Sequence, residues 1–278
     1  MPPPHADRPE ALPAAARRER LAALVADEGF VRVAEASALF GISSVTLRSD
    51  LSALERAGAL RRVHGGAMAV SREGRESPVE ATAERDAELK RAIGHRAAAL
   101  VTSGSSILLD VGSTTLAVAR ALVARSELSE LTVVTNGLSI ALALEAAIPR
   151  FTVVVTGGTL RPLQHSLVNP LAGSTLAGLH VDLAILGCNG IAEGPDGLGR
   201  VTNVNLAEAE VKRAMLAAST ARMLVADGSK VGQRHLGLIG GLAEFGTMVT
   251  GGSGADALRE LAAGAGTRLV RAEPGDLG

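Results

Sequence analysis

A short segment near the N-terminus gathers side chains that can bind DNA. The stretch SSVTLRSDLSALERAGALRRVHGGA, residues 43–67, contains four arginines and one histidine. Guanidinium groups bind phosphates and donate paired hydrogen bonds to guanine in the major groove, where small polar and methyl-bearing side chains read other bases. The residues that we expect to contact DNA are Ser44, Val45, Thr46, Arg48, Ser49, Ser52 and Arg56 on one helix, and Arg61, Arg62 and His64 after it.

A second set of polar residues follows apolar runs in the rest of the chain. Glycine lets backbone N–H groups approach an anion closely, and hydroxyl groups add donors, so a loop such as GSTT at the start of a helix can hold a phosphate. Any one of these loops is explained by ordinary turn chemistry, but several at one sheet edge favour a binding site. They are DVGSTT (110–115), TNG (135–137), TGG (156–158), GCNG (187–190), DGSK (227–230) and TGG (250–252).

Lysine usage points to the same loops. The chain has 25 arginines but three lysines, Lys90, Lys212 and Lys230. A chain that favours arginine keeps lysine where a compact, rotatable ammonium is needed. An ion pair with Glu208, one helical turn away, explains Lys212, whereas Lys230 at a strand end favours a ligand. Cys188 in GCNG has no neighbouring histidine to activate it, so we interpret it as a small buried thiol.

The DNA-binding segment requires a small helical domain to position it. The pattern predicts a helix from residue 17 to Gly29, a strand over 30–33, a second helix over 34–40 and a third helix between Ser43 and Gly58. Leu47, Leu51 and Leu54 form the buried stripe of the third helix. Two extended runs around His64–Gly66 complete a β-hairpin wing. The prediction is a winged helix-turn-helix.

The later loops require a sheet of parallel strands. Apolar runs of strand length precede each of them, with helical segments between most of them, as at 114–124, 137–147 and 207–219. Continuous apolar runs are typical of parallel strands that are buried on both faces. The fold class is therefore α/β, with a winged helix-turn-helix before a mostly parallel sheet. The expected divisions are a disordered tail (1–16), the DNA-binding domain (17–70), a linker (71–85) and a second domain (86–278).

Composition limits the remaining function classes. The 278 residues include no Trp or Tyr, which disfavours recognition of splayed-out bases by aromatic stacking. One cysteine excludes a disulfide framework, and the six histidines show no metal-ligand spacing, so we expect no metal and no cofactor. Neither a signal peptide nor a membrane span is evident, so we expect a cytoplasmic protein with no membrane partner. The net charge of −1 does not by itself indicate a DNA-binding protein.

The segment GISSVTLRSDLSALERAGALRRVHGGA resembles the N-terminal signature of the DeoR-type family of bacterial transcription regulators. Thr46, Leu47, Arg48, Asp50 and Leu51 match its recognition helix, and residues 62–67 match its wing. Ser49 departs from the pattern, because the family usually has a second arginine there. The resemblance implies binding to double-stranded operator DNA, with altered or weaker recognition through the lost guanidinium.

Residues 90–270 resemble the effector domain of the same family, which is similar in fold to ribose-5-phosphate isomerase. The matching segments include LLDVGSTT, VVTNGLSIA, TGGTLR, LAILGCNGI, EAEVKRAM and VADGSK. The resemblance implies a pocket for a phosphorylated sugar or a related metabolite. The segment HSLVNP (165–170) departs from the family pattern at the rim of this pocket. The implied site residues are Asp110, Gly112, Ser113, Thr114, Thr115, Asn136, Gly157, Gly158, Asn189, Glu208, Lys212 and Lys230.

Two functions remain open from the sequence. The first is a transcription regulator of carbohydrate metabolism genes, most often a repressor in this family, which responds to a sugar phosphate. The second is a sugar-phosphate isomerase with an accessory N-terminal module, for which Asp110, Glu208 and Lys230 could supply acid–base groups. We favour the regulator, without catalytic residues, because the enzyme reading leaves the DNA-binding segment without a purpose. Two half-sites are read by two winged helices, so we expect a homodimer or larger assembly.

Overall fold

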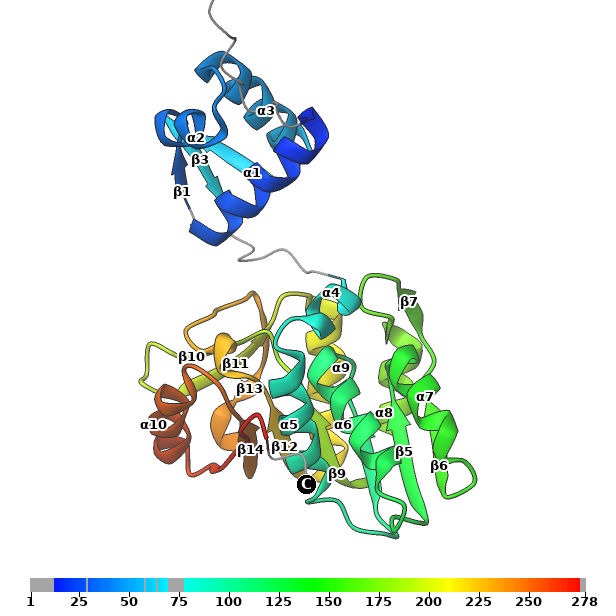
Figure 1. Cartoon of the computed structure of the whole chain (residues 1–278). Coiled ribbons are helices and arrows are strands. Elements are labelled where there is room, and N and C mark those ends of the chain that lie inside the picture. The colour runs from blue at the N-terminus through cyan, green and yellow to red at the C-terminus, as the bar shows by residue number, and fades with distance from the viewer. Residues whose placement is uncertain (1–12, 29, 58, 64, 70–77, 276–278) are drawn as a thin grey trace, which may run out of the picture. The chain divides into compact units, whose positions relative to one another are not determined.

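The protein was examined as a computed structural model, which describes residues 13–28, 30–57, 59–63, 65–69 and 78–275. The chain forms two compact units, residues 1–74 and residues 75–278 (Figure 1). Each unit has its own hydrophobic core, so each is described by itself.

The N-terminal unit is a winged helix-turn-helix, as predicted. Its three strands form an antiparallel sheet in the order β1-β3-β2, so the strand before the second helix joins the wing. Ser43 caps the third helix by accepting a hydrogen bond from the Thr46 N–H at 3.1 Å. The elements are α1 (Ala14–Glu28), β1 (Phe30–Arg32), α2 (Val33–Phe40), α3 (Ser44–Arg56), β2 (Leu60–Val63) and β3 (Gly66–Ala69).

The core of this unit follows the predicted leucine stripe. Leu47, Leu51 and Leu54 of α3 are buried in one cluster with Leu21 and Val25 of α1. The opposite face of α3 is thereby left to solvent. Burial of the stripe fixes which side chains of α3 are available to a partner.

The start of the first helix differs from the prediction. Helix α1 begins at Ala14, so residues 14–16 belong to the helix and not to a disordered tail. Alanine is the strongest helix former, and the Pro13 carbonyl accepts a hydrogen bond from the Arg17 N–H at 2.9 Å. Gly58, predicted to end α3, and His64 of the wing turn lie outside the described residues, as does the side chain of Arg61.

The predicted linker contains a helix, which corrects its boundary. Helix α4 (Val79–Glu84) belongs to the C-terminal unit. Val79 is buried, and its N–H donates to the Leu163 carbonyl at 3.0 Å. One apolar side chain among polar neighbours is enough to anchor this segment, so the polar composition alone was misleading. Residues 71–77 lie outside the described part of the chain.

The C-terminal unit is built on a seven-stranded parallel sheet in the order β15-β14-β12-β9-β4-β5-β6. In chain order the strands are β4 (Ser106–Leu109), β5 (Leu131–Thr135), β6 (Phe151–Val155), β9 (Val181–Leu186), β12 (Ser219–Val225), β14 (Thr247–Thr250) and β15 (Arg268–Arg271). All but β15 coincide with the predicted apolar runs. Strand β15 was missed because an arginine stands at each of its ends.

Helices cover both faces of this sheet, and each face has its own aliphatic core. One core includes side chains of α5 (Ala87–Ala98), α6 (Ser113–Ala124) and α7 (Leu138–Leu144). The other includes side chains of α8 (Pro170–Ala177), α9 (Leu206–Ala217) and α10 (Ala255–Ala265). This three-layer arrangement confirms the predicted α/β class.

Several smaller elements were not predicted. A three-stranded antiparallel sheet comprises β10 (Gly190–Glu193), β11 (Gly199–Asn203) and β13 (Gly237–Gly241). A hairpin comprises β7 (Thr159–Arg161) and β8 (Ser166–Val168). These strands are short and rich in glycine and polar residues, so they lack the apolar runs that identify the main sheet. The predicted helix 137–147 ends in a 3₁₀ turn (Glu145–Ala147), and the helix predicted to reach Ser219 ends at Ala217.

Asp50 joins the first and third helices of the N-terminal unit. Its carboxylate accepts hydrogen bonds from Arg17 Nε at 2.6 Å and Arg18 Nε at 2.8 Å, and the residue is 2% exposed. Burial pushes the pKa of Asp50 upward, but the hydrogen bonds and charges of the two arginines outweigh it and hold that pKa below its usual value. The ionised carboxylate therefore stabilises the unit.

We expect Asp50→Asn to destabilise the N-terminal unit by about 1 to 3 kcal/mol at pH 7, because it removes a charge-assisted pair. Since the folded-state pKa is lowered, this contribution is present above about pH 4 and is lost as pH falls through the lowered value. Amide hydrogen exchange in α1 and α3 measures the effect. Glu35→Gln, which breaks the exposed Arg32–Glu35 pair, is the control and should leave protection unchanged. Equal protection in Asp50→Asn and the parent would contradict the assignment.

Candidate DNA-binding face and effector site

The exposed face of α3 carries the side chains predicted to read DNA. Ser44, Val45, Thr46, Arg48 and Ser49 are exposed. Val45 is 72% exposed, although it is apolar. A solvent-facing methyl group beside arginine and small hydroxyl residues is suited to contact with thymine methyls and base edges.

Part of the predicted face also holds the wing against α3. The Arg62 N–H donates to Glu55 Oε1 at 2.9 Å, and Arg62 Nη1 donates to Ser52 Oγ at 2.7 Å. Ser52 Oγ donates in turn to the Arg48 carbonyl at 2.8 Å. The Ser52 hydroxyl therefore has two partners within the N-terminal unit. Its role in the structure is to position Arg62, and not to face a base. Arg56 is exposed, and its Nε donates to the Ser52 carbonyl at 3.3 Å.

The predicted strand-end loops lie at the carboxyl ends of the parallel strands, along one edge of the C-terminal sheet. Strands β6, β5, β4, β9, β12 and β14 are consecutive neighbours and all parallel, so the residues that follow them meet at the same edge. Asp110 follows β4, Asn136 follows β5, Gly187 follows β9 and Asp227 closely follows β12. The main sheet therefore gathers residues that lie more than 100 positions apart.

The centre of this edge holds a buried ion pair between Asp110 and Lys212. Lys212 Nζ donates to Asp110 Oδ2 and, at 3.1 Å, to the Gly187 carbonyl. The Gly187 N–H donates to the same Asp110 oxygen at 3.1 Å. Burial raises the pKa of Asp110, opposed by the neighbouring ammonium of Lys212. Within the described residues, the ion pair of Lys212 is with Asp110, which corrects the expected pairing with Glu208.

Glu208 has a separate set of partners. Its Oε1 accepts hydrogen bonds from Arg161 Nη1 and, at 2.6 Å, from Ser166 Oγ, and its Oε2 accepts one from Asn203 Nδ2 at 3.2 Å. Arg161 and Ser166 belong to the β7–β8 hairpin. Glu208 therefore fastens that hairpin to α9. Arg161, Ser166 and Asn203 carried no sequence signal, because their roles depend on the position of Glu208.

Asn136 and Asp110, at the centre of this edge, each have one polar atom with no hydrogen-bond partner among the described residues. Asn136 Oδ1 accepts a hydrogen bond from the Val111 N–H at 3.0 Å. Asn136 Nδ2 and Asp110 Oδ1 are buried and have no hydrogen-bond partner in the described part of the chain. Buried polar atoms are nearly always paired, so two unpaired ones on neighbouring strand ends indicate a place where another molecule binds.

The GSTT loop forms the N-terminus of α6 beside these atoms. Gly112 is the N-cap residue, with φ of 146° that favours glycine. Thr115 is fully buried, and its hydroxyl donates to the Gly112 carbonyl at 3.0 Å, so Thr115 shapes the turn. Ser113 is half-buried and Thr114 is buried. The first turn of a helix presents N–H groups and a positive dipole end to an anion.

Other predicted site residues serve the architecture. Gly157 and Gly158 have φ of 73° and 123°, and a Cβ on Gly158 would lie 2.5 Å from the Val168 carbonyl. Asn189 Oδ1 accepts a hydrogen bond from the Val204 N–H at 3.0 Å. Gly158 therefore permits close packing against the strand β8, and Asn189 shapes the loop after β11.

The remaining two lysines gather around Asp227. Lys230 Nζ lies 3.9 Å from Asp227 Oδ2, and Asp227 Oδ1 accepts a hydrogen bond from the Ser229 N–H at 3.0 Å. Burial pushes the pKa of Asp227 upward, but the charge of Lys230 and the Ser229 hydrogen bonds hold it below its usual value. Lys90 is buried and donates to the carbonyls of Thr82 and Arg85, and burial lowers its pKa despite the charge of Asp227. Lys90 was absent from the predicted site, although the scarcity of lysine was a signal.

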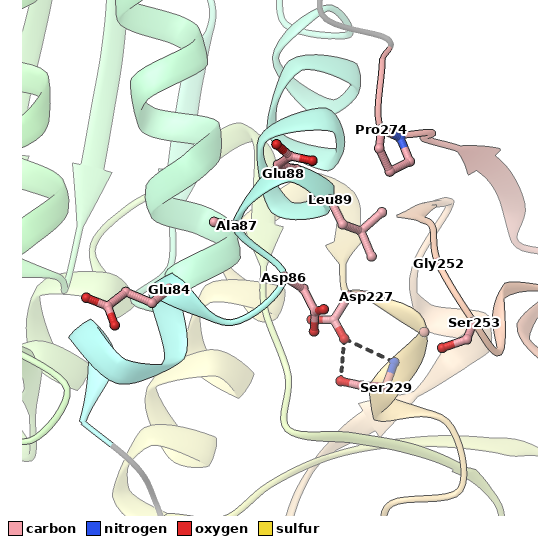
Figure 2. Close-up of a pocket in the computed structure, with 11 residues that line it drawn as sticks. Glu84, Asp86, Ala87, Glu88, Leu89, Asp227, Ser229, Gly252, Ser253 and Pro274 are labelled. Atoms are coloured by element: carbon pink, nitrogen blue, oxygen red, sulfur yellow. Dashed lines mark hydrogen bonds between the residues drawn. The ribbon is translucent and has the colours of Figure 1, made fainter.

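A pocket of about 480 Å³ is lined in part by Asp227 and Ser229. Figure 2 shows Asp86 and Asp227 beside Ser229, with Glu84, Glu88 and Ser253 around them. Cys188, in the loop after β9, is half-buried. Burial raises the pKa of the Cys188 thiol to about 12, which opposes a nucleophilic role. Among the residues described, no group of His, Cys, Asp and Glu is arranged to hold a metal ion, and no helix could cross a membrane.

A winged helix-turn-helix joined to an α/β unit with a polar strand-end site defines a transcription regulator that carries its own ligand-binding domain. Residues 17–73 match the family model described as the DeoR-like helix-turn-helix domain, and residues 85–252 match the DeoR C terminal sensor domain. The chain belongs to the DeoR family of transcriptional regulators.

Similar proteins extend over most of the chain. GlpR of Haloferax volcanii is 35% identical, over 92% of this chain and 97% of that protein. The glycerol-3-phosphate regulon repressor of Haemophilus influenzae is 30% identical, over 84% of this chain and 88% of that protein. Ribose 5-phosphate isomerase A of Methanocaldococcus jannaschii aligns with 54% of this chain and 56% of its own at 17% identity and a TM-score of 0.39, which carries no argument about activity.

We expect Arg48→Ala to weaken operator binding by about 1 to 3 kcal/mol and to relax discrimination between sites, because Arg48 projects from the exposed face of α3. Arg61→Ala on the wing should instead weaken binding to all sequences and reduce the salt dependence. Gel-shift titrations at two salt concentrations, on an operator defined by footprinting, measure both. Unchanged operator affinity in Arg48→Ala would show that α3 is not the recognition helix.

We expect Cys188 to react with iodoacetamide at pH 8 about 1000-fold more slowly than an ordinary cysteine, because its raised pKa leaves almost no thiolate. Mass spectrometry of alkylated protein over time measures the rate. The same chain unfolded in urea is the control and should react at the ordinary rate. Equal rates in the folded and unfolded chain would contradict the raised pKa of the thiol.

Proposed function

We propose that this protein is an operator-binding repressor of carbohydrate metabolism genes that is controlled by a phosphorylated sugar or polyol. The observation that carries the proposal is the pair of unpaired buried atoms, Asp110 Oδ1 and Asn136 Nδ2, beside the N-terminus of α6. The name of the Haemophilus relative, a glycerol-3-phosphate regulon repressor, supports an effector of this chemical class.

The two parts of the site suit the two parts of such a ligand. The first turn of α6 offers N–H groups and the Ser113 hydroxyl to a phosphate, and Lys230 adds an ammonium. Asp110 Oδ1 can accept a hydrogen bond from a ligand hydroxyl, and Asn136 Nδ2 can donate one. A carboxylate acceptor and an amide donor beside an anion site match a hydroxylated phosphate ester.

Helix α4 is placed to respond to the ligand. Lys90 donates hydrogen bonds to the carbonyls of Thr82 and Arg85 at the C-terminal end of α4, and its pKa is lowered by burial and raised by the charge of Asp227. At the other end, Val79 bonds to Leu163 between the strands of the hairpin that Glu208 fastens. Since α4 is the first helix of the C-terminal unit, a ligand that shifts either wall of the site would shift the start of this unit.

The contacts of the acidic residues favour a sensor over an isomerase. An enediol mechanism needs a carboxylate that is free to take a proton from carbon. Both oxygens of Glu208 accept hydrogen bonds from the protein, so Glu208 is not free to act as that base, and one oxygen of Asp110 is held by Lys212. We therefore propose that the protein is not an enzyme, and that it acts in the cytoplasm as a homo-oligomer on double-stranded operator DNA.

We expect a phosphorylated sugar to raise the melting temperature of the protein, because a ligand that binds only the folded state stabilises it. The matching unphosphorylated sugar should do much less. Lys230→Ala and Thr114→Val should reduce the shift, measured from the ligand-free melting temperature of each variant, because we assign both residues to the proposed phosphate site. A melting screen over triose, pentose and hexose phosphates measures this, with Arg259→Ala, an exposed arginine on α10, as the control.

The same ligand should change operator affinity, and operator DNA should change ligand affinity by the same factor. A flat melting response across the panel, with operator affinity unmoved, would contradict the effector proposal. Conversion of any sugar phosphate at an enzymatic rate would contradict the assignment as a sensor.

A further inference from the structure

The two edges of the main sheet differ in how they are protected. Strand β15 (RLVR) has an exposed arginine at each end, and Arg271 is paired with Asp256 and Glu273. Strand β6 (FTVVV) has no charged residue. Edge strands usually carry charges, prolines or bulges that prevent pairing with another chain. Strand β6, at one edge of the sheet (Figure 1), lacks the charges that guard β15 at the other edge.

The backbone of β6 has a free row of hydrogen-bonding groups. The Thr156 N–H donates to the Thr135 carbonyl of the β5 end, and alternate residues of a parallel strand point their backbone groups to the same side. The N–H and C=O groups of Phe151, Val153 and Val155 therefore point away from β5. In the described part of the chain no strand pairs with this side.

Apolar side chains surround this row on both faces of the sheet. Val154 and Val155 are 37% and 41% exposed, and they project to opposite faces. Leu142 of α7 is 70% exposed, and α7 packs against β6. Leu171 is 66% exposed, one turn from Thr175, whose hydroxyl bonds to the Thr156 carbonyl at the end of β6. We call this surface the β6 edge: Leu142, Ile148, Val154, Val155, Leu160 and Leu171.

The β6 edge is large enough for a stable dimer. Its six side chains expose on the order of 500 Å² of apolar surface, and a standard interface of about 800 Å² per partner is about 65% apolar when it joins identical subunits. Residues 131–144 and 151–160 contain no charged side chain. A two-fold axis at β6 would therefore bring no like charges of the paired strands together, whereas a two-fold axis at β15 would place Arg268 opposite the partner's Arg271.

We propose that a second copy of this chain pairs with the β6 edge, strand against strand, about a two-fold axis at Val153. In this register Val153 lies opposite its own copy and Phe151 lies opposite the partner's Val155. The Phe151–Val155 pair occurs twice by symmetry, so there are three pairs. Each pair exchanges two hydrogen bonds, which makes about six in all. The two sheets become one continuous sheet. The two-fold axis also supplies the pair of DNA-binding units that an operator-binding repressor requires, and this part of the inference rests on the proposed function.

Sedimentation velocity of the full chain tests the surface. The parent should sediment as an assembly of 28.2 kDa chains, and Val155→Asp should weaken the pairing at least about 100-fold, because it buries an unpaired charge. Val153→Pro should act in the same way, because the Val153 N–H points away from β5 and its loss removes no bond within the chain. Leu236→Asp, at an 81% exposed leucine outside the β6 edge, is the matched control and should assemble like the parent.

Cross-linking tests the register independently of stability. In a Cys188→Ser background, Val153→Cys should form a disulfide between two chains, because Cα atoms in such a pair are about 5.5 Å apart. Assembly of Val155→Asp and Val153→Pro as in the parent, or a monomeric parent without a cross-link, would overturn the proposal. We expect the melting response to sugar phosphates to be the same in a monomeric Val155→Asp as in the parent, because Val155 is not among the proposed effector residues. Absence of this response in the parent would contradict the proposed function and leave the interface proposal standing, whereas assembly of Val155→Asp would do the reverse.

Discussion

The buried contact between Asp110 and Lys212 joins three parts of the C-terminal unit. Asp110 stands at the end of β4, its carboxylate also receives the N–H of Gly187 at the end of β9, and Lys212 comes from α9 on one face of the sheet. Two charges in a dry interior cost several kcal/mol to desolvate, so they are tolerated only when their contacts are complete. This requirement fixes α9 against the sheet, and with it Glu208, which in turn holds the β7–β8 hairpin through Ser166.

The same interaction separates residues that build the site from residues that remain for a ligand. Lys212 occupies one oxygen of Asp110, and the other oxygen remains unpaired in the described structure. The Asn136 amide is similar: Oδ1 accepts a hydrogen bond from the Val111 N–H, and Nδ2 is unpaired among the described residues. One half of each side chain is thus used to hold its position, and the other half is presented in a fixed direction, which is what a preorganised binding site needs.

Buried aspartates with basic partners recur in both units. Asp50 ties α1 to α3 through Arg17 and Arg18, and Asp227 ties the end of β12 to Lys230. Asp50 meets two arginines of another helix, whereas Asp227 meets a lysine three residues further along the same loop. The arginine pair stabilises the contact between α1 and α3, whereas the lysine lies in the loop where we propose that an anion binds. The bulky, planar guanidinium suits the first role, and the compact ammonium suits the second.

The sequence by itself determined the winged helix-turn-helix, the α/β class and the set of strand-end loops. Periodicity, caps such as Ser43, and continuous apolar runs are local signals, and they were enough for all but one strand of the main sheet. Only the tertiary structure decided which residues of those loops have structural roles. In the structure Lys212 pairs with Asp110 and not with Glu208, and Thr115, Gly158 and Asn189 shape the loops. Lys90 holds the end of α4, and Val79 anchors α4 to the C-terminal unit. The physical reason is that a buried polar atom takes the best partner within about 3 Å in space, and strand order in a parallel sheet places that partner far away along the chain.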